Sequence, residues 1–184
     1  LRGGRMDEAI NLLGEAFAEL GVVVPDSFVG GLEGLSALRA AIRARGLRFS
    51  RVDAASVPAE RLERIDLSWG IAVGVLLNDL GRALPLIARY LLDALELGEP
   101  HRLVRGLCLY HAFVDGPLSG ADGVPDMGGL ECAESLQRQG GTAAGRAWLA
   151  LARGFQHMAT GRMQVVMLHA GVGSKHGHDR FCVH

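Results

Sequence analysis

Residues 81–98 read GRALPLIARYLLDALELG, a stretch in which apolar residues recur three and four positions apart. In a helix of about 3.6 residues per turn, that spacing places them on one face. The residues that share this face are Leu84, Ile87, Ala88, Leu91 and Leu95. Gly98 is placed to end the helix, and Pro100 suits the first turn of the next one. The stretch therefore predicts an amphipathic helix that packs against other helices.

The same spacing recurs on both sides of this stretch. It predicts helices over residues 6–20, 32–45, 58–79, 100–114, 130–136 and 143–158, and a further helix that begins at Arg162. No run of alternating β-branched residues predicts a strand. The expected fold class is all-α.

Three of these helices lead to specific expectations about burial or about which residues share a face. The second half of the helix over residues 58–79 is apolar on all sides, which predicts the most buried element of the fold, with Trp69 and Leu76 packed inside. The helix over residues 32–45 carries its apolar residues at Leu32, Leu35, Leu38, Ala41 and Ile42. In the helix that follows Thr142, the residues expected to share a face are Ala147, Leu151, Gly154, Phe155 and Met158.

A repeat is visible in the helix starts. The pair Gly-Arg occurs at residues 4–5, 81–82 and 161–162, which indicates a unit of about 40 residues with two helices, in the range of helical solenoids. Glycines inside the expected helices fit close packing of neighbouring helices, and they are Gly70, Gly74, Gly106, Gly145 and Gly154. The alternative is an irregular helical bundle.

Composition excludes several classes of protein. The formal net charge of -1 argues against a nucleic-acid surface, and the longest uncharged run, residues 67–78, is too short to cross a membrane. Three widely spaced cysteines and no signal peptide predict a cytoplasmic protein. Since the chain begins with Leu1, we expect a fragment of a larger protein.

Metal-ligand residue types crowd together only at the C-terminus. The chain ends in SKHGHDRFCVH, where the candidate ligands are His176, His178, Cys182 and His184. A structural zinc site needs four ligands held in a tetrahedron, usually as pairs on a stable knuckle or helix. These residues lie on a glycine-punctuated terminus with no helical or strand pattern. We expect a helical domain over residues 1–170 and, over residues 171–184, a disordered tail or an artificial end without bound metal.

Two other groups of residues are candidates for binding or chemistry. A basic stretch, which we predict as a partner surface or otherwise a solvated face, consists of Arg39, Arg43, Arg45, Arg48 and Arg51. Cys108 and His111 lie together on an expected buried helix, where a cysteine is more often a small core residue than a nucleophile.

The first expected helix, GRMDEAINLL, resembles the second helix of a tetratricopeptide-type repeat at Gly4, Glu8, Ala9 and Leu13. Three longer segments, GLRFSRVDAASVPAERLERIDLSWGIAVGV, LLDALELGEPHRLVRGL and LARGFQHMATGRM, resemble in their order the helical-repeat region of large bacterial signalling proteins. In those proteins a serine/threonine protein kinase domain is followed by an AAA-type ATPase module and then a tetratricopeptide-like array. The resemblance covers roughly residues 2–168 and implies antiparallel helix pairs stacked as a solenoid segment.

The resemblance also implies a function. It points to a non-catalytic segment for protein interaction or regulation, whose partner is another protein or a neighbouring domain of the same polypeptide. No active-site residue is carried over and no cofactor is expected, because the phosphate-binding and catalytic signatures of kinases and ATPases are absent from the chain. Two alternatives remain open: a helical sensor module of an ATPase-linked transcription regulator, and a small metal-dependent protein that uses the C-terminal histidines and cysteine.

Overall fold

The computed structural model describes residues 22–116 and 128–159, and within these ranges every regular element is a helix. The α-helices are α2 (Phe28–Arg45), α3 (Ala59–Leu76), α4 (Leu80–Leu97), α5 (Pro100–Tyr110), α7 (Gly129–Arg138) and α8 (Ala143–Ala159), joined by a 3-10 turn, η1 (Ala54–Ser56), and a π-helical turn, η2 (His111–Asp115). The all-α class is confirmed. The helices expected over residues 6–20 and from Arg162 lie outside the described residues.

Local side-chain chemistry sets where the helices begin. The side chain of Asp79 accepts a hydrogen bond from the backbone N–H of Arg82 (3.1 Å) at the start of α4, and Thr142 accepts one from Gly145 (3.0 Å) at the start of α8. Such caps satisfy N–H groups that have no partner within the helix. The expected helix over residues 58–79 therefore ends at Leu76, and Asp79 opens the next helix instead.

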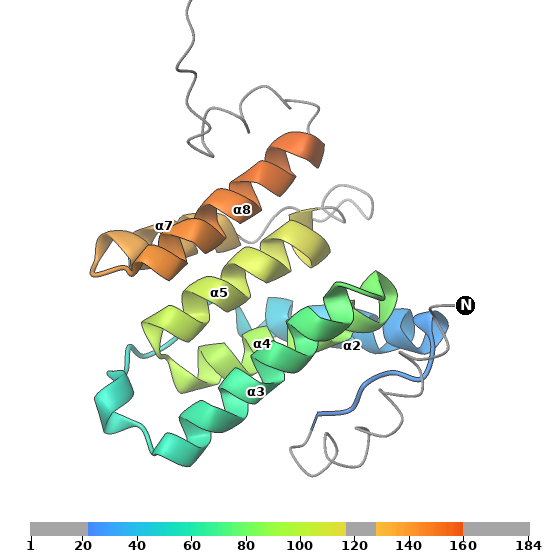
Figure 1. The fold of residues 1–184 in the computed structure, drawn as a ribbon, viewed down its shortest axis with the longest axis horizontal. Coiled ribbons are helices and arrows are strands. Elements are labelled where there is room, and N and C mark those ends of the chain that lie inside the picture. Colours follow the sequence, from blue (N-terminus) through green and yellow to red (C-terminus); the bar gives the residue numbers. More distant parts are fainter. Residues whose placement is uncertain (1–21, 117–127, 160–184) are drawn as a thin grey trace, which may run out of the picture.

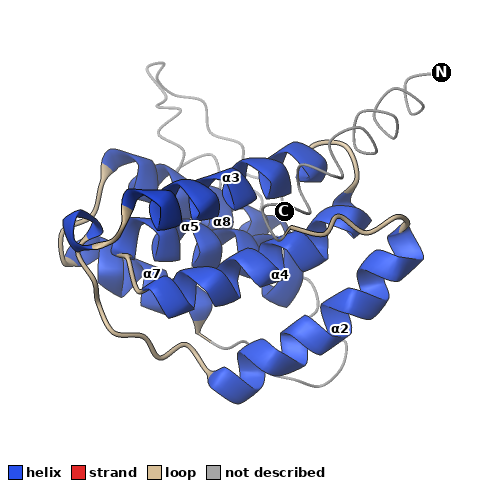
Figure 2. Cartoon of the chain, turned by 90° about the horizontal axis from the view of Figure 1, so that it is seen from below, coloured by secondary structure: helices blue, strands red, loops and turns tan. Residues whose placement is uncertain are grey.

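The helices are arranged around α4 and then around α5. Both α2 and α3 pack on α4, α5 packs on its next side, and α7 and α8 pack on α5 (Figure 1). In Figure 2, α4 lies between α2 and α3, which follow one another in the chain across a 13-residue connection, residues 46–58. The stacking of successive antiparallel pairs expected from the glycine spacing stays a prediction. In the described part of the chain, none of the helices has the length and apolar character needed to cross a bilayer.

The centre of the fold is α4, which corrects the expectation for residues 58–79. Residues 81–88 of α4 are all buried, as are the five apolar residues predicted on its inward face. In α3 only Ile65, Ala72 and Val75 are buried, while Trp69 and Leu76 are half-buried. The apolar run in α3 misled the prediction because periodicity identifies an apolar face but not how many neighbours the helix has. Among the described residues α3 makes most of its contacts with α4, so several of its apolar side chains are left partly exposed.

The residues expected to share a face in the last described helix are mostly exposed. In α8, Leu151 and Met158 are 43% and 42% exposed and Ala147 is exposed, whereas Leu149 and Ala152 are buried. Of the expected residues only Phe155 packs inward, against Phe113 of η2 (centroids 4.6 Å apart). The helix has apolar residues on two sides, so its sequence did not determine which side faces α5. In α2 the apolar residues divide: Leu32 and Ala41 are exposed, while Leu35 and Ile42 are buried.

Glycines permit close approach at some helix contacts and not at others. A Cβ on Gly31 of α2 would lie 2.6 Å from the backbone oxygen of Gly81 in α4. That oxygen has no intrahelical N–H donor, because the residue four positions on is Pro85. A Cβ on Gly106 would likewise lie 3.0 Å from the Tyr90 ring. A Cβ on Gly70 or Gly74, by contrast, would meet nothing within 4 Å. The expectation that helical glycines permit close packing is therefore wrong for the two glycines of α3.

A pair of alanine substitutions separates these two kinds of glycine. Gly74→Ala should raise the free energy of unfolding by about 1 kcal/mol, because alanine is the better helix former at an open position. Gly31→Ala should lower it despite the same gain in propensity, because the new methyl group pushes α2 away from α4. Urea unfolding of both variants measures the difference, and a stabilised Gly31→Ala variant would contradict the close contact.

Candidate functional site

A cluster of ionic and aromatic side chains joins α3, α4, α5 and α8. Asp66 of α3 forms ion pairs with both Arg102 and Arg105 of α5, whose side chains are only 12% exposed. Glu99 accepts hydrogen bonds from the N–H groups at the start of α5 and also binds the guanidinium of Arg102 (3.0 Å). Three helix-borne charges and a helix cap thus neutralise one another at the α3–α5 contact.

Aromatic rings complete this cluster. The guanidinium carbon of Arg105 lies 4.9 Å from the centroid of the Trp69 ring, and its Nε donates to the hydroxyl of Tyr90 (3.0 Å). Tyr90 in turn donates to the backbone oxygen of Arg102 (3.2 Å). Trp69 contacts the Tyr90 ring (5.1 Å between centroids) and meets Trp148 of α8 edge-on (4.9 Å). We call these seven residues the Asp66 cluster: Asp66, Trp69, Tyr90, Glu99, Arg102, Arg105 and Trp148.

The titration of this cluster fits a structural role. Burial alone would raise the pKa of the Asp66 carboxyl, but the hydrogen bonds and charges of Arg102 and Arg105 together outweigh it, so the pKa lies below the usual value. Burial raises the pKa of the Tyr90 hydroxyl. A general acid or base works best with a pKa near the operating pH, and both groups are shifted away from neutrality. The cluster holds helices together and is not poised for proton transfer.

The Asp66→Asn substitution tests this role through pH. We expect a loss of about 1–2 kcal/mol at pH 7, less than for a fully buried pair, because the Asp66 side chain is 42% exposed. A lowered folded-state pKa stabilises the protein above the unfolded pKa of about 3.9, and this stabilisation disappears as the pH falls through the folded value. Chemical unfolding at several pH values should show wild type and variant converging below about pH 4. A gap that stays constant down to pH 3 would contradict the ion pairs.

The reactive residue types on α5 are enclosed. Cys108 and Tyr110 are buried, and burial raises the pKa of each to about 12. His111, at the start of η2, is 2% exposed. A cysteine acts as a nucleophile only as its thiolate, which is scarce when the pKa is so high. These residues serve as core, the reading favoured for Cys108 on sequence grounds.

The five arginines of the predicted partner surface lie in separate places. Arg39 and Arg43 share a half-buried side of α2, where Arg43 lies 3.9 Å from Asp115 of η2. Arg45, the last residue of α2, donates to the backbone oxygen of Arg48 in the connection that follows (2.8 Å). Farther on, Arg51 donates to the side chain of Gln139 after α7 (3.2 Å). Binding of a partner by this stretch stays a prediction, and only its exposed members, Arg48 and Arg51, are open to solvent.

Two of the hollows among the described residues are open to solvent. The larger, about 410 Å³, lies between residues 51–54, the start of α5 and the α7–α8 connection. His101 lines it, its pKa lowered by burial and by the charge of Arg105, with Nδ1 3.4 Å from the Thr142 hydroxyl. The other, about 220 Å³, lies between α3 and α4 and is bordered by arginines and acids of opposite charge. Neither hollow concentrates one charge or one chemical type of residue.

No group of metal-ligating side chains exists among residues 22–116 and 128–159. The candidate ligands His176, His178, Cys182 and His184 lie outside the described residues, so the metal-dependent alternative stays untested by the structure.

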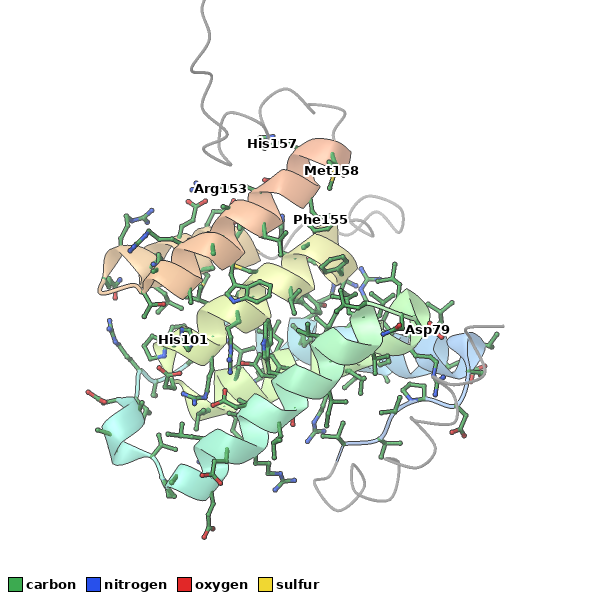
Figure 3. All side chains as sticks on the ribbon, in the orientation of Figure 1. Asp79, His101, Arg153, Phe155, His157 and Met158 are labelled. Atoms are coloured by element: carbon green, nitrogen blue, oxygen red, sulfur yellow. The ribbon has the colours of Figure 1, made fainter. Side chains whose placement is uncertain are left out.

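One exposed apolar surface of the described residues is the side of α8 that faces away from α5. Figure 3 shows Phe155 pointing toward α5, while Arg153 and His157 point to the opposite side of the helix. Apolar and small residues lie between these two directions, and we call them the outer face of α8: Ala143, Ala144, Ala147, Ala150, Leu151, Gly154 and Met158. A helix that is apolar on both sides is normally covered on both sides. The outer face is thus the candidate binding surface of the described part of the chain.

The sequence did not reveal the Asp66 cluster. Two features of the sequence could have indicated it. Arg102 and Arg105 stand one turn apart at the start of a helix, and a single acid, Asp66, interrupts an otherwise apolar face of α3. Sequence spacing alone does not show that residues 36 and 39 positions apart meet, and only the packing of α3 beside α5 brings them together.

Comparison with known proteins adds no assignment: no family model, no curated protein and no solved structure matches this chain.

Proposed function

We propose that this chain is a non-catalytic helical interaction segment, acting in regulation within a larger bacterial signalling protein that carries a serine/threonine kinase and an AAA-type ATPase module. In this proposal the helices form part of a tetratricopeptide-like stack in the cytoplasm, and the partner is a protein or a neighbouring domain. The order of the three segments that resemble such helical-repeat regions supports the setting.

One observation carries the proposed activity, the exposure of the outer face of α8. Leu151 and Met158 are large apolar residues, each more than two-fifths exposed, on a helix whose opposite side is already buried. Exposed apolar helix faces of this kind bind other helices, with anchors spaced three and four residues apart. The ionisable clusters, by contrast, are engaged within the protein, as the ion pairs of Asp66 illustrate.

A peptide with the right apolar spacing tests the proposal. The chain's own residues 5–20, RMDEAINLLGEAFAEL, supply such a stripe, and the neutral probe replaces their four acids, Asp7, Glu8, Glu15 and Glu19, by Asn or Gln. By calorimetry we expect saturable binding to the full chain, weakened at least about tenfold by Leu151→Glu, because docking would bury an unpaired carboxylate. Leu67→Glu is the matched control, since Leu67 is a 50% exposed leucine on α3.

Three results would contradict the proposal. Equal binding by the Leu151→Glu and Leu67→Glu variants, or no binding at all, would remove the outer face of α8 as an interaction surface. Hydrolysis of ATP or phosphate transfer by the purified chain would remove its non-catalytic character.

A further inference from the structure

We infer that the outer face of α8 selects amphipathic helices that carry acidic residues beside their apolar stripe. This inference rests on the proposed function and names the chemistry of the partner. Five residues of the face follow a spacing of three and four: Ala144, Ala147, Leu151, Gly154 and Met158. That is the spacing of a helix seam, and its small residues let a second helix axis come close while Leu151 and Met158 supply apolar anchors.

The polar side chains that α8 itself contributes to one edge of this face belong to basic residue types. No aspartate or glutamate occurs anywhere in α8, whereas Arg146, Arg153 and His157 follow one another along one border of the outer face. Arg153 is already paired with Glu134 of α7 (2.7 Å), and Arg146 is exposed. A docking helix therefore meets a cationic border on one side and the body of the protein on the other. Opposite charges across such a border raise association rates and select the partner.

Charge complementarity also argues against two other occupants. A second copy docked antiparallel through its own α8 would bring two basic borders together, which is unfavourable. The chain after α8, residues 160–184, contains a single acid, Asp179, against Arg162, Lys175 and Arg180. A helix with several acids and an apolar stripe fits better. Residues 5–20 of the chain have this chemistry, with four acids and one arginine, and their sequence is a suitable probe.

The experiment compares charge versions of one peptide. The full chain is titrated with the acidic peptide of residues 5–20 and with a version in which its four acids are lysines, at low salt and at about 1 M salt, where the Debye length is about 3 Å. At low salt we expect the acidic peptide to bind about tenfold more tightly than the lysine version. At high salt the two peptides should bind with nearly equal affinity. Arg146→Glu should reduce the preference severalfold. The matched control is Arg48→Glu, an exposed arginine of the predicted basic stretch.

Each outcome has one meaning. If the neutral peptide binds through Leu151 but acidic and lysine versions bind equally, the charge selection is wrong and the proposed function stands. If no version binds, both are wrong. If Arg48→Glu reduces the preference for the acidic peptide and Arg146→Glu does not, the binding site lies on the basic stretch and the inference is wrong. Concentration-dependent self-association of the chain that Leu151→Glu abolishes would make a second copy the occupant and overturn it as well.

Discussion

Replacing Leu91 with alanine should lower the free energy of unfolding by about 3–5 kcal/mol, the largest effect that we expect from a core substitution. Leu91 is fully buried in α4, and α2, α3 and α5 pack around this helix. A cavity left between elements that are fixed on several sides cannot collapse, so the loss approaches the upper end of the range for Leu→Ala. Urea unfolding followed by circular dichroism measures the change.

Two other leucines calibrate this result. Leu76 of α3 is half-buried and should lose less than Leu91, whereas Leu67 is 50% exposed and should change the stability by less than about 1 kcal/mol. If Leu76→Ala proved as costly as Leu91→Ala, α3 would be as central as its sequence first indicated, and the placement of α4 would be wrong.

The second large effect is expected at Gly98, between α4 and α5. Its φ of +76° lies in the left-handed region, which costs alanine about 1–2 kcal/mol. In addition, a Cβ would lie 1.9 Å from the backbone oxygen of Ser50, and the Gly98 oxygen accepts a hydrogen bond from Val52 (3.0 Å). Gly98→Ala must therefore displace the connection before α3, at a further cost of about 1–3 kcal/mol. Thermal unfolding, with chemical denaturation as a check, measures the total loss of stability from the two effects.

Gly46 provides the comparison for Gly98. It also has a positive φ, +69°, but a Cβ there would meet nothing within 4 Å. Gly46→Ala should therefore show only the cost of the backbone conformation, about 1–3 kcal/mol. A Gly46→Ala variant less stable than Gly98→Ala would mean that residues 50–52 do not pack on the α4–α5 turn.

Much of the fold could be predicted from the sequence where one helix had one apolar face. The five apolar residues predicted on one face of residues 81–98 are buried as expected, because a single stripe leaves one way to pack. The prediction failed in α3 and was incomplete in α8, where apolar residues occupy more than one side. There the number of neighbours decides which side is covered, and that number depends on contacts between distant segments.

The candidate site shows the same limit. The basic stretch was read as one surface from its spacing, yet Arg43 approaches Asp115 and Arg51 reaches Gln139, because α2 and the connection after it contact different helices. The spacing in α8 indicated that Leu151 and Met158 share a face, and the structure shows that both are exposed. What the pattern did not supply was whether the packing partner belongs to the described part of the chain.

The openness of the outer face of α8 is the central claim, and the accessibility of single cysteines tests it most directly. In a background with Cys132→Ser and Cys182→Ser, Leu151→Cys and Ala152→Cys place thiols on the two sides of α8, 43% and 1% exposed in the native residues. With the full chain alone, Leu151→Cys should react with a thiol reagent on the order of 100-fold faster than Ala152→Cys, which reacts only through opening of the fold. Equal protection of the two thiols would show that the outer face is already covered within the chain and is not a surface for a partner.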